Sequence, residues 1–369
     1  MDARQLALKQ LQGSVITTPN GLKLYTPDGA GSYAALWMRD FSYMIEDAGD
    51  LFDPEEICAC LEYLFSHARK EDGWIPDRVY ADGTVCYTAG DMDETGRARA
   101  NLDDNAFAVI ATERYRELAA PEDGDAFLHK WHDALIRALR ATPLSENGLV
   151  YNDPESPHSP YGFTDCICKT GLCAFESLIH YRACKIAAGW GDEEFAKIAS
   201  DMEAHFEEVF FPDGNIFPYA ATVDCRQEDV WAACYALAIG FPLSEKRIAS
   251  LRNALMAEYD LLTQNGQLRH LYKDESWEKF LIDVPFGTYQ NGAYWATPLK
   301  WLVCALLPEY PQQASLALSD ALEDFAENGC CECINGSYRK LPDYVVSATA
   351  AYGAQAALDD FLRSKEQNA

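Results

Sequence analysis

Acidic, amide and aromatic side chains occur together in six short segments of this chain. The segments are 37–40, 101–104, 161–165, 226–229, 288–291 and 332–337. The faces of aromatic rings cover C–H surfaces, whereas Asp, Asn, Gln and Arg exchange hydrogen bonds with hydroxyl groups. A sugar offers both kinds of surface. If the segments meet in the fold, we therefore expect them to form a sugar-binding cavity.

The candidate binding residues lie in these segments or near them. They are Trp37, Arg39, Asp40, Trp74, Asp77, Arg78, Asp103, Asp104, Lys169, Glu228, Asp229, Tyr289, Gln290, Asn291 and Trp295. An Asp at a helix start is often only a cap for backbone N–H groups, an alternative that applies to Asp40, Asp104 and Asp229. A cap needs one short polar side chain, however, and these segments also carry large aromatic and cationic ones. The loop 74–78 is expected to form a wall or lid, or else to be an ordinary packed loop.

The spacing of the segments indicates how the fold brings them together. If one polar residue at each expected helix start is taken as a marker, consecutive markers are 53 to 64 residues apart. An interval of that length fits one loop and a pair of helices. Six pairs predict a closed ring of helices with the marked ends at one mouth. The markers are Asp40, Asp104, Asp165, Asp229, Gln290 and Asp343.

Apolar residues recur at helical spacing along most of the chain, which favours an all-α fold. Such stripes cover 57–65, 107–115, 172–184, 230–237, 295–307, 316–325 and 345–362. A helix from Ala3 to Leu11 would lie beside the last one and complete an (α/α)6 barrel. The mixed segment from Ser14 to Ala35 predicts a short β excursion. Because no linker or shift in composition divides the chain, we expect one domain over 1–369, with residues 1–36 packed on the barrel.

The overall charge restricts the classes of partner. A net charge of −28 and a pI near 4.5 disfavour nucleic acid and anionic membrane surfaces, which need Lys and Arg partners. We expect a small carbohydrate as the partner of a monomer or homo-oligomer. Thirteen cysteines, with no signal peptide or membrane-length apolar run, are typical of the reducing cytoplasm. The cysteine clusters 166–168 and 330–333 lack a His at ligand spacing, so we predict no metal and no cofactor.

Three stretches carry a family resemblance. Residues 37–40, which read Trp-Met-Arg-Asp, look like the Trp-x-Arg-Asp segment of glucoamylase-like enzymes. Residues 290–301, QNGAYWATPLKW, resemble the Gln-Trp-Asp…Gly-Trp-Ala-Pro-Leu-Gln segment of trehalases. Residues 332–336, followed by 344–352, resemble a late segment of trehalases and processing α-glucosidases. Together they resemble the six-hairpin, (α/α)6-barrel glycosidase superfamily over most of the chain from Trp37 onward.

The resemblance implies an inverting glycoside hydrolase with Asp165 as general acid and Glu332 as general base. It also implies that Arg39 and Asp40 hold hydroxyl groups of the innermost sugar, and it favours an α-glucosyl-type linkage. An inverting pair needs a gap of roughly 6.5–9.5 Å, which residues from opposite sides of a ring mouth can provide. The apolar neighbours of Asp165 would raise its pKa, whereas Lys169, one turn later, would lower it.

Departures from the family pattern leave alternatives open. Asn291 and Ala293 replace distinctive trehalase residues, which makes trehalose a poor candidate, and Cys333 stands where an aromatic residue is common. Either carboxyl alone has an ordinary interpretation, as a helix cap or as a solvated loop group. A sugar epimerase or isomerase on the same ring would use histidines, of which only His270 falls in an expected mouth loop. A non-catalytic carbohydrate-binding protein would keep the ring without the chemistry.

Overall fold

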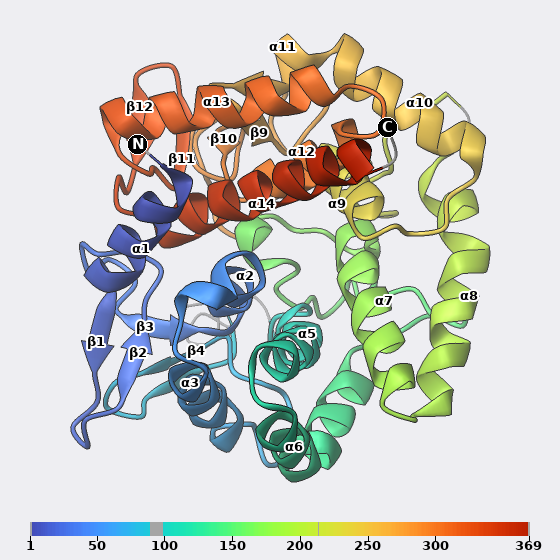
Figure 1. The fold of residues 1–369 in the computed structure, drawn as a ribbon. Coiled ribbons are helices and arrows are strands. Elements are labelled where there is room, and N and C mark those ends of the chain that lie inside the picture. The colour runs from blue at the N-terminus through green and yellow to red at the C-terminus, as the bar shows by residue number, and fades with distance from the viewer. Residues whose placement is uncertain (1, 89–98, 213, 368–369) are drawn as a thin grey trace.

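The computed structural model describes residues 2–88, 99–212 and 214–367 of the chain. In these residues six helices form an inner ring, in which each helix packs against the next. They are α2 (Met38–Ala48), α5 (Asp104–Leu118), α7 (Ala174–Gly189), α9 (Val230–Ala238), α12 (Leu299–Leu306) and α14 (Val345–Gln367). The last helix, α14, packs against α2, so the ring closes between the two ends of the sequence (Figure 1).

Further helices surround the ring and alternate with the inner ones along the chain. They are α1 (Ala3–Gly13), α3 (Pro54–Ser66), α6 (Pro121–Ala141), α8 (Glu193–Phe210), α10 (Glu245–Ala257), followed by the short α11 (Tyr259–Leu262), and α13 (Pro311–Asn328). The outer helices bury one stripe, as in α8, where Phe195, Met202 and Phe206 face inward and the first turn is acidic. Helix α1 packs against α14 as predicted. The predicted (α/α)6 barrel is confirmed.

Short strands occupy the connections between the helix pairs. The predicted β excursion contains β1 (Val15–Thr17) and β2 (Lys23–Tyr25), which pair antiparallel. A further sheet, not predicted from the sequence, has five strands in the order β12-β11-β10-β9-β8. Its strands are β8 (Thr263–Gln264), β9 (Gln267–Arg269), β10 (Tyr294–Trp295), β11 (Cys333–Asn335) and β12 (Tyr338–Lys340). Two smaller sheets join β3 (Ala35–Trp37), β4 (Arg78–Tyr80) and β5 (Val85–Cys86), and β6 (Tyr151–Asn152) with β7 (Gly171–Leu172).

Two of the six expected helix starts are wrong. Asp165 follows a short 3-10 turn, η2 (Gly162–Thr164), and α7 begins only at Ala174. Gln290 lies in a loop, and α12 begins only at Leu299, so Trp295 belongs to strand β10 rather than to a helix. In both places a strand pair, β6 with β7 or β10 with its neighbours, uses the intervening backbone N–H and C=O groups.

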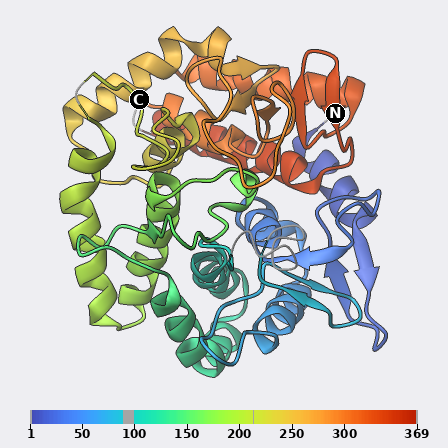
Figure 2. The same cartoon turned by 180° about the vertical axis from the view of Figure 1, so that it is seen from behind.

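Aromatic side chains fill the interior of the ring. The ring of Trp301 on α12 lies 5.0–5.6 Å from the rings of Tyr43, Phe175 and Tyr235, which belong to three other inner helices. Figure 2 shows the opposite face of the molecule, where long connections between helix pairs cross the end of the ring. Within the described ranges, no helix has the length and apolar character needed to cross a bilayer. No two cysteines in the described ranges are joined by a disulfide.

Candidate active site

Several distant parts of the chain enclose a cavity of about 170 Å³ at the end of the barrel where α2 and α14 begin. It is lined by Pro27, Tyr33, Trp37, Arg39, Asp40, Gly162, Phe163, Asp165, Cys166, Ile282, Tyr289, Glu332 and Tyr344. Four of the six segments chosen from the sequence contribute a side chain, and segments 101–104 and 226–229 do not. Pockets for drug-sized ligands usually measure roughly 300–1,000 Å³, so this smaller cavity suits a ligand of about one sugar ring.

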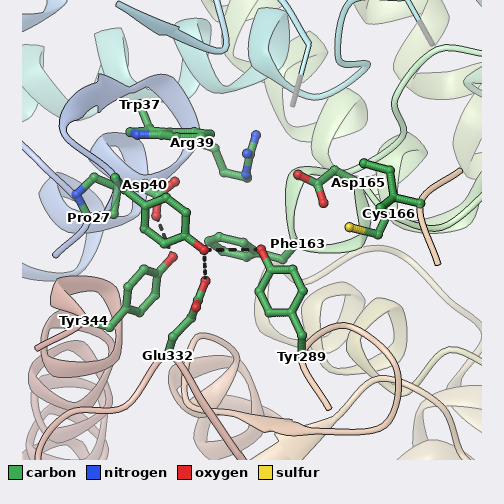
Figure 3. A pocket seen from close by; sticks show the side chains of 13 residues that line it. Pro27, Trp37, Arg39, Asp40, Phe163, Asp165, Cys166, Tyr289, Glu332 and Tyr344 are labelled. Carbon is green, nitrogen blue, oxygen red and sulfur yellow. Dashed lines mark hydrogen bonds between the residues drawn. The ribbon is translucent and has the colours of Figure 1, made fainter. Parts of the chain in front are cut away.

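The carboxyl groups of Asp165 and Glu332 face this cavity from different sides (Figure 3). Asp165 stands directly after η2 and is half-buried. Its Oδ1 accepts a hydrogen bond of 2.6 Å from the Gln290 amide, whose oxygen accepts one of 2.8 Å from the Cys166 backbone N–H. Removal of water by the surrounding protein raises the pKa of Asp165 to about 6, although the Gln290 amide and the Arg39 charge act in the opposite direction.

Glu332 is buried immediately before β11, and both of its carboxylate oxygens receive a donor. The Tyr33 hydroxyl donates to Oε1 at 2.9 Å, and Lys340 Nζ donates to Oε2. Lys340 reaches this position because β11 and β12 form a hairpin in which Cys333 pairs with Lys340. Burial raises the pKa of Glu332 to about 7, against the lowering effects of Lys340 and Tyr33.

Arg39 and Asp40, at the start of α2, supply the other charged groups of the wall. Arg39 Nη2 lies 3.2 Å from Asp77, and Nη1 lies 3.3 Å from Asp103 and 3.4 Å from Asp104. Burial and the neighbouring Asp103 raise the pKa of Asp104 well above its usual range, against the lowering effect of Arg39.

Asp40 is held by the last inner helix. Its Oδ1 accepts a hydrogen bond of 2.6 Å from the Tyr344 hydroxyl, one residue before α14. Burial raises the pKa of Asp40 to about 6, opposed mainly by Arg39. Because Asp40 lines the cavity and a carboxylate accepts several hydrogen bonds, it can still accept one from a hydroxyl group of a ligand.

Aromatic rings form most of the remaining wall. Tyr33 packs edge-on against Trp37, and Phe163 lies beneath the Arg39 guanidinium at 5.4 Å. Tyr289 adopts a positive φ of 42°, which is uncommon for a residue with a side chain and is found mainly where a fold imposes it. The flat rings suit the C–H faces of a sugar.

Several predicted binding residues lie behind the wall and support it. Asp77, Asp103 and Asp104 hold Arg39, and Gln290 holds Asp165. Arg78 pairs with Asp77 at 2.8 Å and places its guanidinium 4.6 Å from the centre of the Trp37 ring. The indole N–H of Trp295 donates to the Tyr289 backbone carbonyl at 3.2 Å. None of these side chains lines the cavity, because each is occupied in fixing one that does.

The structure places the other predicted residues away from the cavity, where each has a local structural role. Trp74 stacks on His158 in a packed loop, Glu228 accepts from the backbone N–H groups of Ile216 and Phe217, and Asp229 caps α9. The Asn291 side chain bonds to the backbone at Trp277 and Val284. Lys169 forms a buried ion pair with Glu176 at 2.7 Å, so it does not oppose Asp165 as the sequence suggested. His270 is buried against Trp231 and also does not line the cavity.

Sequence reasoning missed Tyr33 and Lys340 as partners of Glu332. One signal was present, because Gly336-Ser337 is a residue pair typical of two-residue hairpin turns with Gly in the first position. A hairpin around that turn places Lys340 opposite Cys333, beside Glu332. Tyr33 had no comparable signal, since its position depends on how residues 26–35 fold back over the mouth. Across the described ranges, no group of three His, Cys, Asp or Glu side chains is arranged to hold a metal ion.

No protein family and no curated protein matches the sequence, but solved structures share the fold. An uncharacterized conserved protein from Thermus thermophilus aligns with a TM-score of 0.68 at 14% identity, covering 95% of this chain and 99% of that one. The GH63 mannosylglycerate hydrolase of the same organism, in complex with Tris and D-glycerate, aligns with a TM-score of 0.67 at 15% identity and the same coverage. A rhamnosidase from Klebsiella oxytoca with rhamnose bound aligns with a TM-score of 0.62 at 12% identity, covering 95% of this chain and 62% of that one. Over nearly its whole length, the chain therefore has the helical-barrel fold found in these glycoside hydrolases.

Proposed function

We propose that this protein is a glycoside hydrolase that cleaves a small glycoside with inversion at the anomeric carbon. The observation that carries the proposal is the convergence of Asp165 and Glu332, from distant parts of the sequence, on one sugar-sized cavity. Arg39, Asp40 and the aromatic rings supply the polar and apolar contacts that a sugar needs. Inverting hydrolysis requires two such carboxyl groups, one protonated and one ionised.

In the proposed reaction, Asp165 donates its proton to the glycosidic oxygen as the bond to the anomeric carbon breaks. A water molecule attacks that carbon from the opposite face, and Glu332 takes a proton from this water. The products are a free sugar of inverted configuration and the alcohol that formed the other half of the glycoside. Exchange of one proton with solvent at each carboxyl restores the starting state.

The contacts around each carboxyl support this division of roles. Both oxygens of Glu332 accept from donors, and Lys340, as an ammonium, can only donate. This arrangement fits an ionised Glu332. The partners of Asp165, the Gln290 amide and the Cys166 thiol, are uncharged, so they favour its ionised form less than an ammonium would. The pKa values, about 6 for Asp165 and about 7 for Glu332, would favour the reverse assignment, so the proposed division of roles rests on the ammonium in direct contact with Glu332.

The neighbours in fold support sugar chemistry and guide the choice of substrates. One is a mannosylglycerate hydrolase, observed in another structure with glucose, and others are rhamnosidases. An α-glucosyl linkage remains the first to test, with α-mannosyl and α-rhamnosyl glycosides beside it. The alternative of an epimerase has less support, because His270 does not line the cavity.

The test is a panel of short glycosides, with the anomer of the first product followed by NMR. We expect one glycoside class to be cleaved with inversion, and Asp165→Asn and Glu332→Gln each to lower kcat by about 10²–10⁴-fold. Asp260→Asn and Glu327→Gln, at exposed positions, are matched controls that should keep the wild-type rate. Wild-type turnover in both Asp165→Asn and Glu332→Gln, or retention of configuration, would refute the proposed mechanism.

A further inference from the structure

A cation contacts the carboxylate that we assign as the base. Lys340, the last residue of β12, donates from Nζ to Glu332 Oε2 and to the Tyr33 hydroxyl, the latter at 2.6 Å. The same Nζ lies 3.9 Å from the centre of the Tyr289 ring. Lys340 itself does not line the cavity, and 28% of its side chain is exposed. It therefore approaches Glu332 from behind, outside the space available to a ligand.

The backbone is bent on both sides of this contact. Leu341, directly after Lys340, has a φ of 48°, and Tyr289, against which the ammonium packs, has a φ of 42°. These left-handed conformations cost free energy in residues with side chains. The Glu332 N–H donates to the carbonyl groups of both Lys340 and Leu341, at 2.8 and 3.1 Å, so the bend fixes the lysine beside the carboxylate. An ordinary surface ion pair needs no such backbone.

Apart from Lys340, the ionisable groups that face Glu332 either favour its protonated form or favour its ionised form less strongly than Lys340 does. Asp40 of α2 raises the pKa of Glu332, as burial does, whereas Lys340 and the Tyr33 hydroxyl lower it. Facing groups with raised pKa values, neutral near pH 7, are the phenols of Tyr33, Tyr289, Tyr338 and Tyr344 and the thiols of Cys166 and Cys333. Lys340 is thus the cation that opposes burial of the charge.

We propose that Lys340 is a positioning residue that favours the ionised form of Glu332 and directs its unused lone pairs toward the cavity. This inference rests on the proposed function, in which Glu332 must accept a proton from water. Each carboxylate oxygen can accept two hydrogen bonds, so the donors Lys340 and Tyr33 leave a place for that water. Without Lys340, burial and the charge of Asp40 would favour protonated Glu332, which is unable to act as a base.

The test compares the wild type with Lys340→Met, Lys340→Gln and Lys340→Arg in the full-length protein. The carboxyl of Glu332 is titrated by NMR after ¹³C labelling of glutamate, with Glu332→Gln identifying its signal. Removal of a charge in direct contact should raise the pKa of Glu332 by about one unit or more in the Met and Gln variants and little in the Arg variant. The optimum of kcat/KM should move upward by about half a unit or more, with kcat lowered and KM nearly unchanged.

Lys23→Met is the matched control. Lys23 and Tyr25 both donate to Glu56, which reproduces the Lys-Tyr-Glu trio outside the cavity with an exposed lysine. This variant should keep the wild-type pH profile. An unchanged titration of Glu332 in Lys340→Met and Lys340→Gln would overturn the inference even if the enzyme cleaves glycosides. A shifted titration in a protein that cleaves no glycoside would instead refute the proposed function and leave the effect of Lys340 on Glu332 established.

Discussion

At the scale of single residues, the site holds two carboxyls whose pKa values lie close together. Burial raises the pKa of Asp165 to about 6 and that of Glu332 to about 7. The active form needs protonated Asp165, which is lost as the pH rises through 6, and ionised Glu332, which is lost as the pH falls through 7. Only a minority of molecules then carries both groups in the required form, and this fraction is largest between the two values.

We therefore expect a bell-shaped dependence of kcat/KM on pH, with its maximum between 6 and 7. The measurement follows initial rates on one cleaved glycoside over a series of buffers of constant ionic strength. In Glu332→Gln the residual activity should lose the rising limb on the acid side and keep the falling limb that reports Asp165. A profile that is flat across neutral pH, or that keeps its acid limb in this variant, contradicts the assignment.

The residues of the site could be predicted from the sequence only in part. Trp37, Arg39 and Asp40 adjoin one helix start, so a local motif was enough to place them at the mouth. Asp165 and Glu332 came from resemblance, and the structure places both on the cavity wall. Asp103 and Gln290 were predicted as binding residues, but their side chains contact Arg39 and Asp165. Spacing along the sequence indicates toward which side of an element a side chain points, but not whether a ligand or another side chain lies there.

At the scale of elements, η2 packs so closely on α2 that it leaves no room for a side chain at Gly162. A Cβ atom there would lie 1.5 Å from Cζ of Arg39. We expect Gly162→Ala to displace the guanidinium from Asp77, Asp103 and Asp104, and loss of a buried ionic partner typically costs about 3–5 kcal/mol. Urea unfolding should show this loss of stability, and kcat/KM should fall with it.

Gly189→Ala provides the comparison for this variant. Gly189 is the last residue of α7 and has nothing within 4 Å of an added Cβ. The alanine should leave activity unchanged and alter stability by no more than about 1 kcal/mol, because alanine is favoured over glycine in helices. Wild-type stability and activity in Gly162→Ala would contradict this expectation, because Arg39 could then leave Asp77, Asp103 and Asp104 without cost.

The helices could be predicted and the short strands could not, for a physical reason. Nine or more residues of amphipathic helix repeat their pattern several times, as in α3 and α13, whose apolar stripes were identified. Strands of two or three residues, such as β10 and β11, are too short to show an alternating pattern. Their pairing depends on contacts between residues far apart in sequence, so the sheet that positions Glu332 and Lys340 was missed.

At the scale of the whole molecule, closure of the ring assembles the site. The Tyr33 hydroxyl meets Glu332, and the Tyr344 hydroxyl meets Asp40, so residues near the two ends of the chain share one cavity. Helix α14 packs between α2 and α12 and carries this connection. The site can therefore form only when the first and last inner helices are both in place, which couples its geometry to complete folding.

The same closed molecule carries 58 acidic and 30 basic residues, a net charge of −28. Like charges held on a compact surface repel one another, and dissolved salt screens that repulsion. Salt also weakens exposed ion pairs, but each of these contributes only about 0–1 kcal/mol, so the repulsion should dominate.

We expect Tm to rise as NaCl increases from about 0.02 to 0.3 M, where the screening length shortens several-fold. Calorimetry with NaCl, KCl and choline chloride should give the same rise, because screening does not depend on the cation. A Tm that falls with salt, or that rises with one cation alone, would show that specific ion pairs or ion binding govern stability instead of net charge.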